Sequence, residues 1–287
     1  MLKRRRFRRV PRLKGQTFNR LVPNIITVGA LSAGLTAIRF AFEGRWQFAV
    51  TAILVAAVLD ALDGRMARLL KSASDFGAEL DSLSDVIAFG VAPAIVVYLW
   101  VLSGVEGPGW IAVLFFTVCC ALRLARFNTS IDKLPPYAYN YFTGVPAPAG
   151  AGLAILPMIA SFEFGPAIAA NPIFVGVWMV LVGGTMVSRL PTYSFKKLKI
   201  PQNYVLVVLV AAGLVVAGLA SAPWRTLLVV GVLYLVTIPF ASMSYLRLRR
   251  EAERLHDDSD DAPDQDEDGD EGGSGEGETT TPHLRPV

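Results

Sequence analysis

Six acidic residues lie close together in a part of the chain that is otherwise strongly apolar. They are Asp60, Asp63, Asp75, Glu79, Asp81 and Asp85. A carboxylate inside a membrane-spanning helix costs about 2.5–3.5 kcal/mol on insertion scales, so it requires a partner and usually marks a functional site. The remaining acidic residues fall in predicted loops, at span ends or in the C-terminal tail, where charge is easily solvated.

The spacing of four of these aspartates predicts two opposing pairs. Asp60 and Asp63 are three residues apart on one apolar segment, and Asp81 and Asp85 are four apart on the next, so each pair shares a helical face. Four facing carboxylates repel one another unless a divalent cation binds them, and all-oxygen ligation suits Mg²⁺ or Mn²⁺ rather than Zn²⁺. Carboxylate-held cations of this kind are suited to phosphate transfer. Simple helix capping and helix pairing is the alternative, which four aspartates in this register disfavour.

The residues beside Asp60 indicate what such a site would hold. Gly64, Ala67 and Arg68 fall on the same helical face, which is therefore bare and ends in a positive charge. Such a face lets a large anionic ligand approach the backbone. Both histidines lie beyond residue 255, so a general base in the folded body must be another group, and a carboxylate is the obvious candidate.

The stretch from Asp60 to Asp85 resembles the signature of the CDP-alcohol phosphotransferase family, D-x2-D-G-x2-A-R-x8-G-x3-D-x3-D. All of its fixed positions are present: Asp60, Asp63, Gly64, Ala67, Arg68, Gly77, Asp81 and Asp85. The resemblance implies a six-helix catalytic core, usually in a homodimer. It also implies a reaction in which an alcohol attacks the β-phosphate of a CDP-lipid and expels CMP.

The resemblance also implies roles for individual residues. Asp60 and Asp81 would bridge two divalent metal ions, Mg²⁺ or Mn²⁺; Asp63 would complete one site and Asp85 the other. Asp85 would also be the catalytic residue that takes the proton from the attacking hydroxyl. The residues expected to bind the CDP-lipid are Asn24, Thr27, Gly64, Arg68 and Ser74. For the Pro-Asn-Ile-Ile-Thr segment that contains the first two, helix capping is the alternative.

Three further segments resemble a subgroup of this family, the membrane-spanning bacterial phosphatidylserine synthases. They are Arg123–Asn128, Phe142–Ala151 and Arg189–Lys197. The resemblance implies CDP-diacylglycerol and L-serine as substrates, giving phosphatidylserine and CMP. Arg123 and Arg126 could pair with the carboxylate of an amino-acid acceptor, although anchoring at the membrane surface explains them equally well. Glycerol 3-phosphate and inositol phosphate are alternative acceptors within the family.

The composition predicts a membrane protein. The chain is 53% hydrophobic and 18% charged with a mean hydropathy of +0.46, whereas soluble domains are about 25% charged. The fold class expected is all-α, a polytopic transmembrane bundle of about eight spans. The expected spans are 22–41, 47–69, 82–103, 109–128, 145–162, 172–188, 203–220 and 225–245.

The two ends of the chain differ from this middle. Residues 1–21 are basic and are expected to lie on anionic membrane lipids, with no module that would favour nucleic acid. Residues 22–247 form the catalytic domain, and residues 248–287 are acidic and expected to be disordered.

The distribution of lysine and arginine predicts the orientation in the cell membrane. With both termini in the cytoplasm, all of the 27 basic residues except Arg39, Arg45 and Arg225 lie on the cytoplasmic side. This arrangement puts the aspartates at the cytoplasmic face. A cation-coupled transporter is the alternative from another class, but its carboxylates would be expected at the bilayer midplane and the chain lacks an evident internal repeat.

Overall fold

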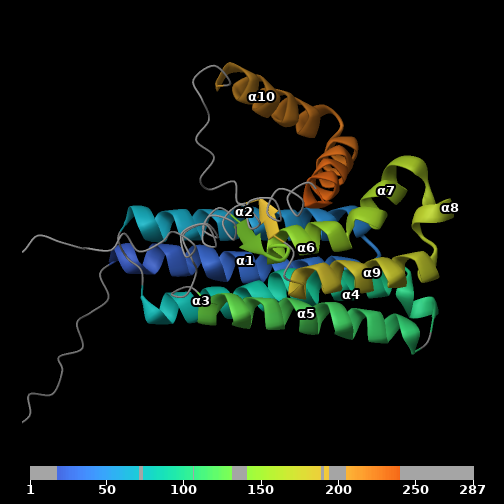
Figure 1. Ribbon diagram of the computed structural model, residues 1–287, viewed down its shortest axis with the longest axis horizontal. Helices are drawn as coiled ribbons and strands as arrows, with labels where there is room; N and C mark the ends of the chain where they lie inside the picture. Colours follow the sequence, from blue (N-terminus) through green and yellow to red (C-terminus); the bar gives the residue numbers. More distant parts are fainter. Residues whose placement is uncertain are drawn as a thin grey trace, which may run out of the picture. The chain divides into compact units, whose positions relative to one another are not determined.

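A computed structural model describes residues 18–70, 74–105, 107–130, 141–188, 191–193 and 205–239 of the chain. These residues are nearly all helical, and the helices are shown in Figure 1. Most of the predicted basic arm and the whole predicted acidic tail lie outside the described residues.

The helices and strands follow one another in this order. The first part consists of α1 (Phe18–Phe42), α2 (Trp46–Leu69), α3 (Asp75–Asp85), the π-helix η1 (Val86–Val91), α4 (Ala92–Trp100), the 3₁₀-helix η2 (Leu102–Gly104) and α5 (Pro108–Ser130). The second part consists of β1 (Tyr141–Thr143), α6 (Ala147–Ala154), α7 (Leu156–Phe164), α8 (Pro166–Ala169), α9 (Pro172–Val187), β2 (Pro191–Tyr193), α10 (Val205–Ser221) and the helix Pro223–Pro239.

Among the described helices, five are long and apolar enough to cross a membrane: Leu21–Phe42, Trp46–Leu69, Asp75–Trp100, Pro108–Thr129 and Ala147–Phe164. Three shorter apolar helices, Pro172–Val187, Val205–Ser221 and Pro223–Pro239, account for the other predicted spans. The prediction of an all-α polytopic membrane bundle is confirmed. Two three-residue strands, β1 and β2, add a small antiparallel pair in which Phe142 is opposite Thr192.

The third span begins earlier than the sequence predicted, at Asp75 rather than at residue 82. The reason is a local cap: the Ser74 side chain accepts a hydrogen bond from the backbone N–H of Gly77 at 3.1 Å. A serine at this position satisfies an N–H group that the first helical turn leaves without a partner. The helix therefore includes Asp81 well inside its length, one turn before Asp85.

The third span contains a π-helical turn, η1, directly after Asp85. Pro93 lies at the start of α4, and a proline there cannot donate the next helical hydrogen bond. Two glycine contacts hold this turn: a Cβ on Gly34 would lie 2.9 Å from Ala88 Cα, and one on Gly90 would lie 3.2 Å from Cys120 Sγ. The backbones of α1 and α5 thus approach η1 closely, a geometry typical of membrane helices.

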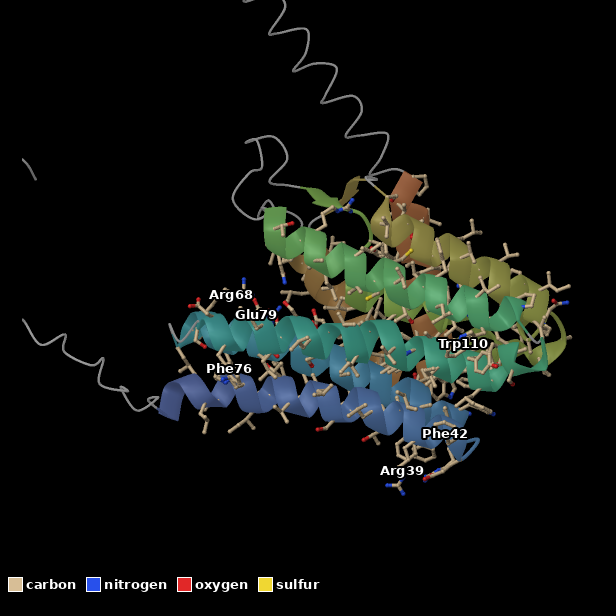
Figure 2. The ribbon with its side chains drawn as sticks, turned by 90° about the horizontal axis from the view of Figure 1, so that it is seen from below. Arg39, Phe42, Arg68, Phe76, Glu79 and Trp110 are labelled. Carbon is tan, nitrogen blue, oxygen red and sulfur yellow. The ribbon has the colours of Figure 1, made fainter. Side chains whose placement is uncertain are left out.

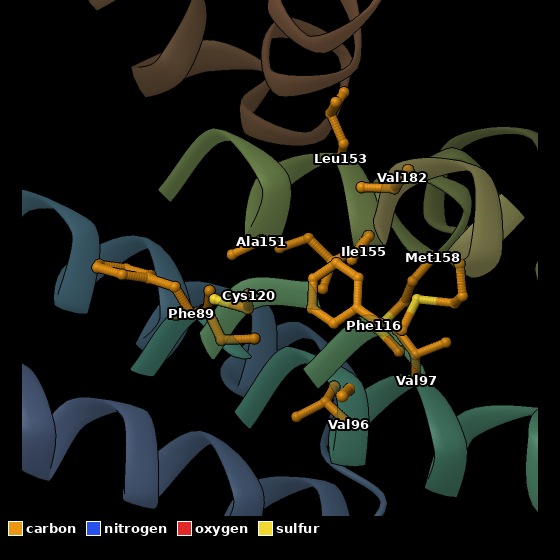
Figure 3. Close-up of a cluster of buried hydrophobic side chains, with 14 of the residues drawn as sticks. Phe89, Val96, Val97, Phe116, Cys120, Ala151, Leu153, Ile155, Met158 and Val182 are labelled. Carbon is orange, nitrogen blue, oxygen red and sulfur yellow. The ribbon is translucent and has the colours of Figure 1, made fainter. Parts of the chain in front are cut away.

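Six labelled side chains mark the two ends of the bundle in Figure 2. Arg68, Phe76 and Glu79 lie at one end, and Arg39, Phe42 and Trp110 lie at the other. The interior between them is filled with apolar side chains, among them Phe89, Phe116 and Met158 (Figure 3). Many large apolar residues are exposed on the outer faces, as expected of a surface covered by lipid.

Gly144 follows β1 and shapes the bend that leads into α6. Its φ is +80°, and an added Cβ would lie 2.4 Å from the carbonyl oxygen of Met186. Only glycine fits a left-handed position with so close a backbone neighbour.

Candidate active site

Three aspartates from two helices lie close together. They precede Arg68 in α2 and follow Glu79 in α3, and Arg68 and Glu79 mark one end of the bundle in Figure 2. Asp60 and Asp63 come from α2, and Asp81 comes from α3. One carboxylate oxygen of each lies within 4.8 Å of those of the other two. We call these three residues the aspartate cluster.

Asp85 lies beside this cluster, one helical turn beyond Asp81. Its side chain is hydrogen-bonded with that of Asp60 and interacts electrostatically with Asp81 and Asp63. The structure thus brings all four predicted aspartates together, with Asp85 on the side that faces deeper into the bundle, toward Arg123. The roles predicted for each of them remain predictions.

A threonine of α1 orients one carboxylate of the cluster. The buried hydroxyl of Thr27 donates to Asp63 Oδ2 at 2.7 Å, and the carbonyl of Pro23 is its alternative acceptor at 3.0 Å. The hydroxyl of Ser84, which is 2% exposed, donates to the backbone carbonyl of Thr27 at 3.2 Å. Ser84 was not among the predicted site residues; its position next to Asp85 is the one signal that could have pointed to it.

The aspartate cluster fits a divalent cation. Asp81 Oδ1 is buried and has no hydrogen-bond partner among the described residues. A buried carboxylate oxygen without a partner is strongly unfavourable unless a cation or hydrogen-bond donor is supplied. The donor atoms are all hard oxygens, which Mg²⁺ and Mn²⁺ prefer.

A pocket of about 140 Å³ adjoins the cluster. Its lining combines α1, α2 and α3, and the residues that form it are Pro23, Asn24, Thr27, Asp63, Gly64, Ala67, Ser74, Gly77, Ala78 and Asp81. Four of the five predicted CDP-lipid residues therefore line one cavity. The fifth, Arg68, is exposed one turn beyond Gly64 and donates from Nε to the Gly64 carbonyl at 2.9 Å.

The two glycines in this pocket differ in what surrounds them. A Cβ on Gly77 would lie 2.9 Å from Asn24 Oδ1 and 3.1 Å from Ser74 Oγ, so glycine is required for α1 and α3 to meet there. A Cβ on Gly64 would meet no described atom within 4 Å. The missing side chain of Gly64 therefore leaves open space on the pocket wall.

The two arginines of α5 have different surroundings. Arg126 donates to the carbonyl oxygens of Val187 at 2.9 Å and Ser188 at 3.2 Å, so it caps the end of α9. Arg123 is only 8% exposed, interacts electrostatically with Asp85, and its Nε has no hydrogen-bond partner among the described residues. Of the two predicted acceptor residues, Arg123 is thus the one beside the aspartates.

Residues 20–187 match the sequence model of a family described as CDP-alcohol phosphatidyltransferase. The chain belongs to this family. Residues 203–239, which include α10 and the following helix, match a second model described as CDP-alcohol phosphatidyltransferase 2.

Sequence similarity to named relatives extends over most of this chain. A CDP-diacylglycerol–serine O-phosphatidyltransferase of Mycobacterium leprae is 39% identical over 233 residues, which are 80% of this chain and 77% of the relative. Proteins with the same name from Helicobacter pylori and Bacillus subtilis are each 36% identical, over 68% and 61% of this chain and 81% and 92% of the relative.

Within this CDP-alcohol phosphatidyltransferase, replacing Thr27 with valine tests the hydroxyl that orients Asp63. The substitution keeps the side-chain shape but removes the 2.7 Å hydrogen bond. Because partners of metal-binding carboxylates typically contribute 10- to 100-fold to affinity or activity, the Mg²⁺ concentration for half-maximal CMP release should rise about tenfold. Thr27→Ser keeps a hydroxyl and should stay near wild type; a valine variant with unaltered metal dependence would rule out this role.

Proposed function

We propose that this enzyme transfers the phosphatidyl group from CDP-diacylglycerol to the hydroxyl of L-serine, giving phosphatidylserine and CMP. The choice of L-serine as the acceptor rests on one observation, the buried guanidinium of Arg123 next to Asp85. A buried arginine with an unpaired N–H is suited to a carboxylate, which serine has and simple alcohols lack. The names of the relatives from M. leprae, H. pylori and B. subtilis support the same acceptor.

The CDP moiety binds against α1, α2 and α3 in this proposal. Asn24, Ser74 and the open face at Gly64 line the cavity next to the cluster. Arg68 adds a positive charge one turn away, where the side chain is exposed and free to turn toward a diphosphate. The acyl chains remain in the bilayer along the apolar outer faces of the helices.

Serine binds on the other side of the aspartates, with its carboxylate on Arg123 and its hydroxyl near Asp85. Asp85 accepts the hydroxyl proton while the serine oxygen attacks the β-phosphorus in line. The new bond joins that oxygen to phosphorus, and the bond between phosphorus and the bridging diphosphate oxygen breaks. CMP leaves with the bonding electrons, and the proton on Asp85 passes to solvent.

The aspartate cluster and Asp85 would together hold the divalent metal ions in this proposal. Asp60 and Asp81 would be shared between two sites, with Asp63 completing one site and Asp85 the other. When bound, such cations neutralise the charge on the transferred phosphate and on the leaving group. Thr27 keeps Asp63 oriented for this task through its 2.7 Å hydrogen bond.

The placement in the cell is part of the same proposal. This multi-pass membrane protein has both termini in the cytoplasm, because that orientation keeps most lysines and arginines inside. The aspartates then open toward the cytoplasm, from which serine arrives. A homodimer and contacts between the basic arm and anionic lipids complete the proposal.

The direct test is to supply purified protein with CDP-diacylglycerol, Mg²⁺ and one labelled alcohol at a time. L-Serine should give labelled phosphatidylserine and one equivalent of CMP. A labelled product from glycerol 3-phosphate or inositol phosphate instead would keep the family reaction and replace the acceptor. No CMP release with any alcohol would favour the transporter alternative.

Replacing Gly64 with alanine tests the CDP-lipid pocket. The new methyl group meets no described atom, and alanine favours a helix over glycine by about 0.5–1 kcal/mol, so the thermal stability should not fall. The methyl group would occupy ligand space, and overpacking of about 1–3 kcal/mol should raise the KM for CDP-diacylglycerol roughly 5- to 150-fold.

Gly184→Ala is the matched control for this variant. Gly184 is also an exposed helical glycine with no described atom within 4 Å of an added Cβ, but it lies in α9, away from the pocket. Its KM for CDP-diacylglycerol should equal that of the wild type. If Gly64→Ala behaves in the same way, Gly64 does not face the bound lipid nucleotide.

A further inference from the structure

The helix Pro223–Pro239 is attached to the rest of the bundle along its length. Near its start, Arg225 forms an ion pair with Glu163, and Trp224 packs edge-on against Phe162 with ring centroids 5.0 Å apart. Further along, Gly231 allows Leu156 to approach its backbone. These contacts fix the helix against α7 and carry its later residues toward the aspartate end.

Tyr234 lies about 14 Å further along this helix than Arg225, at 1.5 Å per residue. Its phenol oxygen is buried and has no hydrogen-bond partner among the described residues. A buried phenol normally finds a partner, because an unpaired buried hydroxyl is unfavourable. The unpaired hydroxyl therefore indicates that something outside the described chain completes it.

Tyr234 faces the charged group of Arg123, a residue of α5. The two side chains interact electrostatically, and Arg123 in turn interacts with Asp85. Arg123 Nε is a second buried donor without a hydrogen-bond partner among the described residues, and the residue is only 8% exposed. Two buried donors from two helices, each without a hydrogen-bond partner among the described residues, thus interact with each other, and one of them, Arg123, also interacts with Asp85.

We propose that Tyr234 is a substrate-contacting residue that, with Arg123, binds the carboxylate of the amino-acid acceptor. A carboxylate offers two oxygens that only accept hydrogen bonds, and a phenol O–H and a guanidinium N–H are both donors. One bound carboxylate therefore satisfies both orphaned groups at once. This role rests on the proposed reaction. It gives the helix Pro223–Pro239, which lies outside the aspartate signature, a part in selecting the acceptor alcohol.

The test is Tyr234→Phe, which keeps the ring and removes only the hydroxyl. Wild-type protein must first form phosphatidylserine from L-serine; if it does not, the proposed function fails, whatever the variant does. Given that activity, the KM for L-serine should rise about tenfold or more in the variant, as expected for loss of a hydrogen bond to a charged group. The KM for CDP-diacylglycerol should not change.

Two inhibitors that cannot react separate a carboxylate contact from other effects. L-Alanine keeps the carboxylate and amine of serine, so its inhibition constant should rise by the same factor as the KM for serine. Ethylamine lacks the carboxylate, so its inhibition constant should not change. A serine KM within twofold of wild type, or an equal rise for ethylamine, would overturn the proposal.

Tyr98→Phe is the matched control. Tyr98 is a half-buried tyrosine of α4 that packs edge-on against Trp110, at the end of the bundle opposite Arg68. Its loss of a hydroxyl should leave the serine KM unchanged. The melting temperature of Tyr234→Phe is a second measurement. It should not fall, because the substitution removes a buried hydroxyl that has no hydrogen-bond partner among the described residues. A lower melting temperature would indicate a structural hydrogen bond and contradict the proposal.

Discussion

Replacing Asp85 with asparagine should lower the rate of CMP release by at least 100-fold while leaving CDP-diacylglycerol binding intact. Asparagine preserves the size and one oxygen of the side chain, but its amide cannot accept the proton of the attacking hydroxyl. General-base catalysis contributes about 10²- to 10⁴-fold, which sets the expected loss. The measurement is CMP release under saturating substrates, together with the dissociation constant of the CDP-lipid.

Asp85 is the aspartate best placed for this task. Asp63 is tied to Thr27, and Asp81 takes part in the three-carboxylate cluster. Asp85 is hydrogen-bonded with Asp60 on one side and interacts with Arg123 on the other. It therefore stands between the other proposed metal ligands and the proposed acceptor residue, Arg123.

Asp75→Asn is the matched control for Asp85→Asn. Asp75 is an exposed aspartate in the first turn of the same helix, and it is outside the cluster. Its substitution should change stability by no more than about 1 kcal/mol, the usual contribution of a charge at a helix N-terminus, and should leave turnover unchanged. Near-normal turnover of Asp85→Asn would remove the proposed base.

The sequence predicted that the four aspartates come together, and the structure agrees, because the signal is local. Pairs spaced by three and four residues on apolar helices have to share a face, and α2 and α3 follow one another in the chain. In the structure α2 and α3 both pack against α1, and their acidic faces meet beside it. Asn24 and Thr27, by contrast, were expected near the site only because the segment that contains them resembles the family, and the structure places both in the lining of the pocket.

The predicted boundaries were less accurate where a polar residue, rather than hydropathy, decides them. The third span starts at Asp75 because Ser74 caps it, although Glu79 and Asp81 make its first turns too polar for a hydropathy window. The first membrane span, by contrast, is Leu21–Phe42, within one residue of the predicted bounds. The helix α1 itself begins at Phe18, so Pro23 lies inside the helix and not at its start.

Contacts between distant segments could not be predicted from one sequence. Arg126 caps α9 through carbonyls 61 and 62 residues away, and Ser84 reaches a backbone carbonyl of α1 57 residues away. Side-chain bonds to backbone groups leave no periodic trace. The sequence therefore predicted the same role for Arg123 and Arg126. In the structure Arg123 lies beside the aspartates, whereas Arg126 caps the end of α9.

Removal of divalent metal should stop the reaction completely. EDTA should abolish CMP release, and excess Mg²⁺ or Mn²⁺ should restore it, because three carboxylates with oxygens within 4.8 Å of one another repel strongly unless a cation neutralises them. Activity that persists in chelator would contradict the metal site.

A stability measurement separates metal binding from any effect on turnover. A cation that binds only the folded protein stabilises it by about 2.7 kcal/mol at 100 times its dissociation constant, so Mg²⁺ should raise the melting temperature of the wild type. Asp81→Asn should lose this shift, since it removes the carboxylate whose buried Oδ1 lacks a partner among the described residues. The same variant should be at least as stable as the wild type in EDTA, because one of three mutually repelling charges is gone. Asp75→Asn should keep the full shift, and a shift that survives in Asp81→Asn would mean that the cation binds elsewhere.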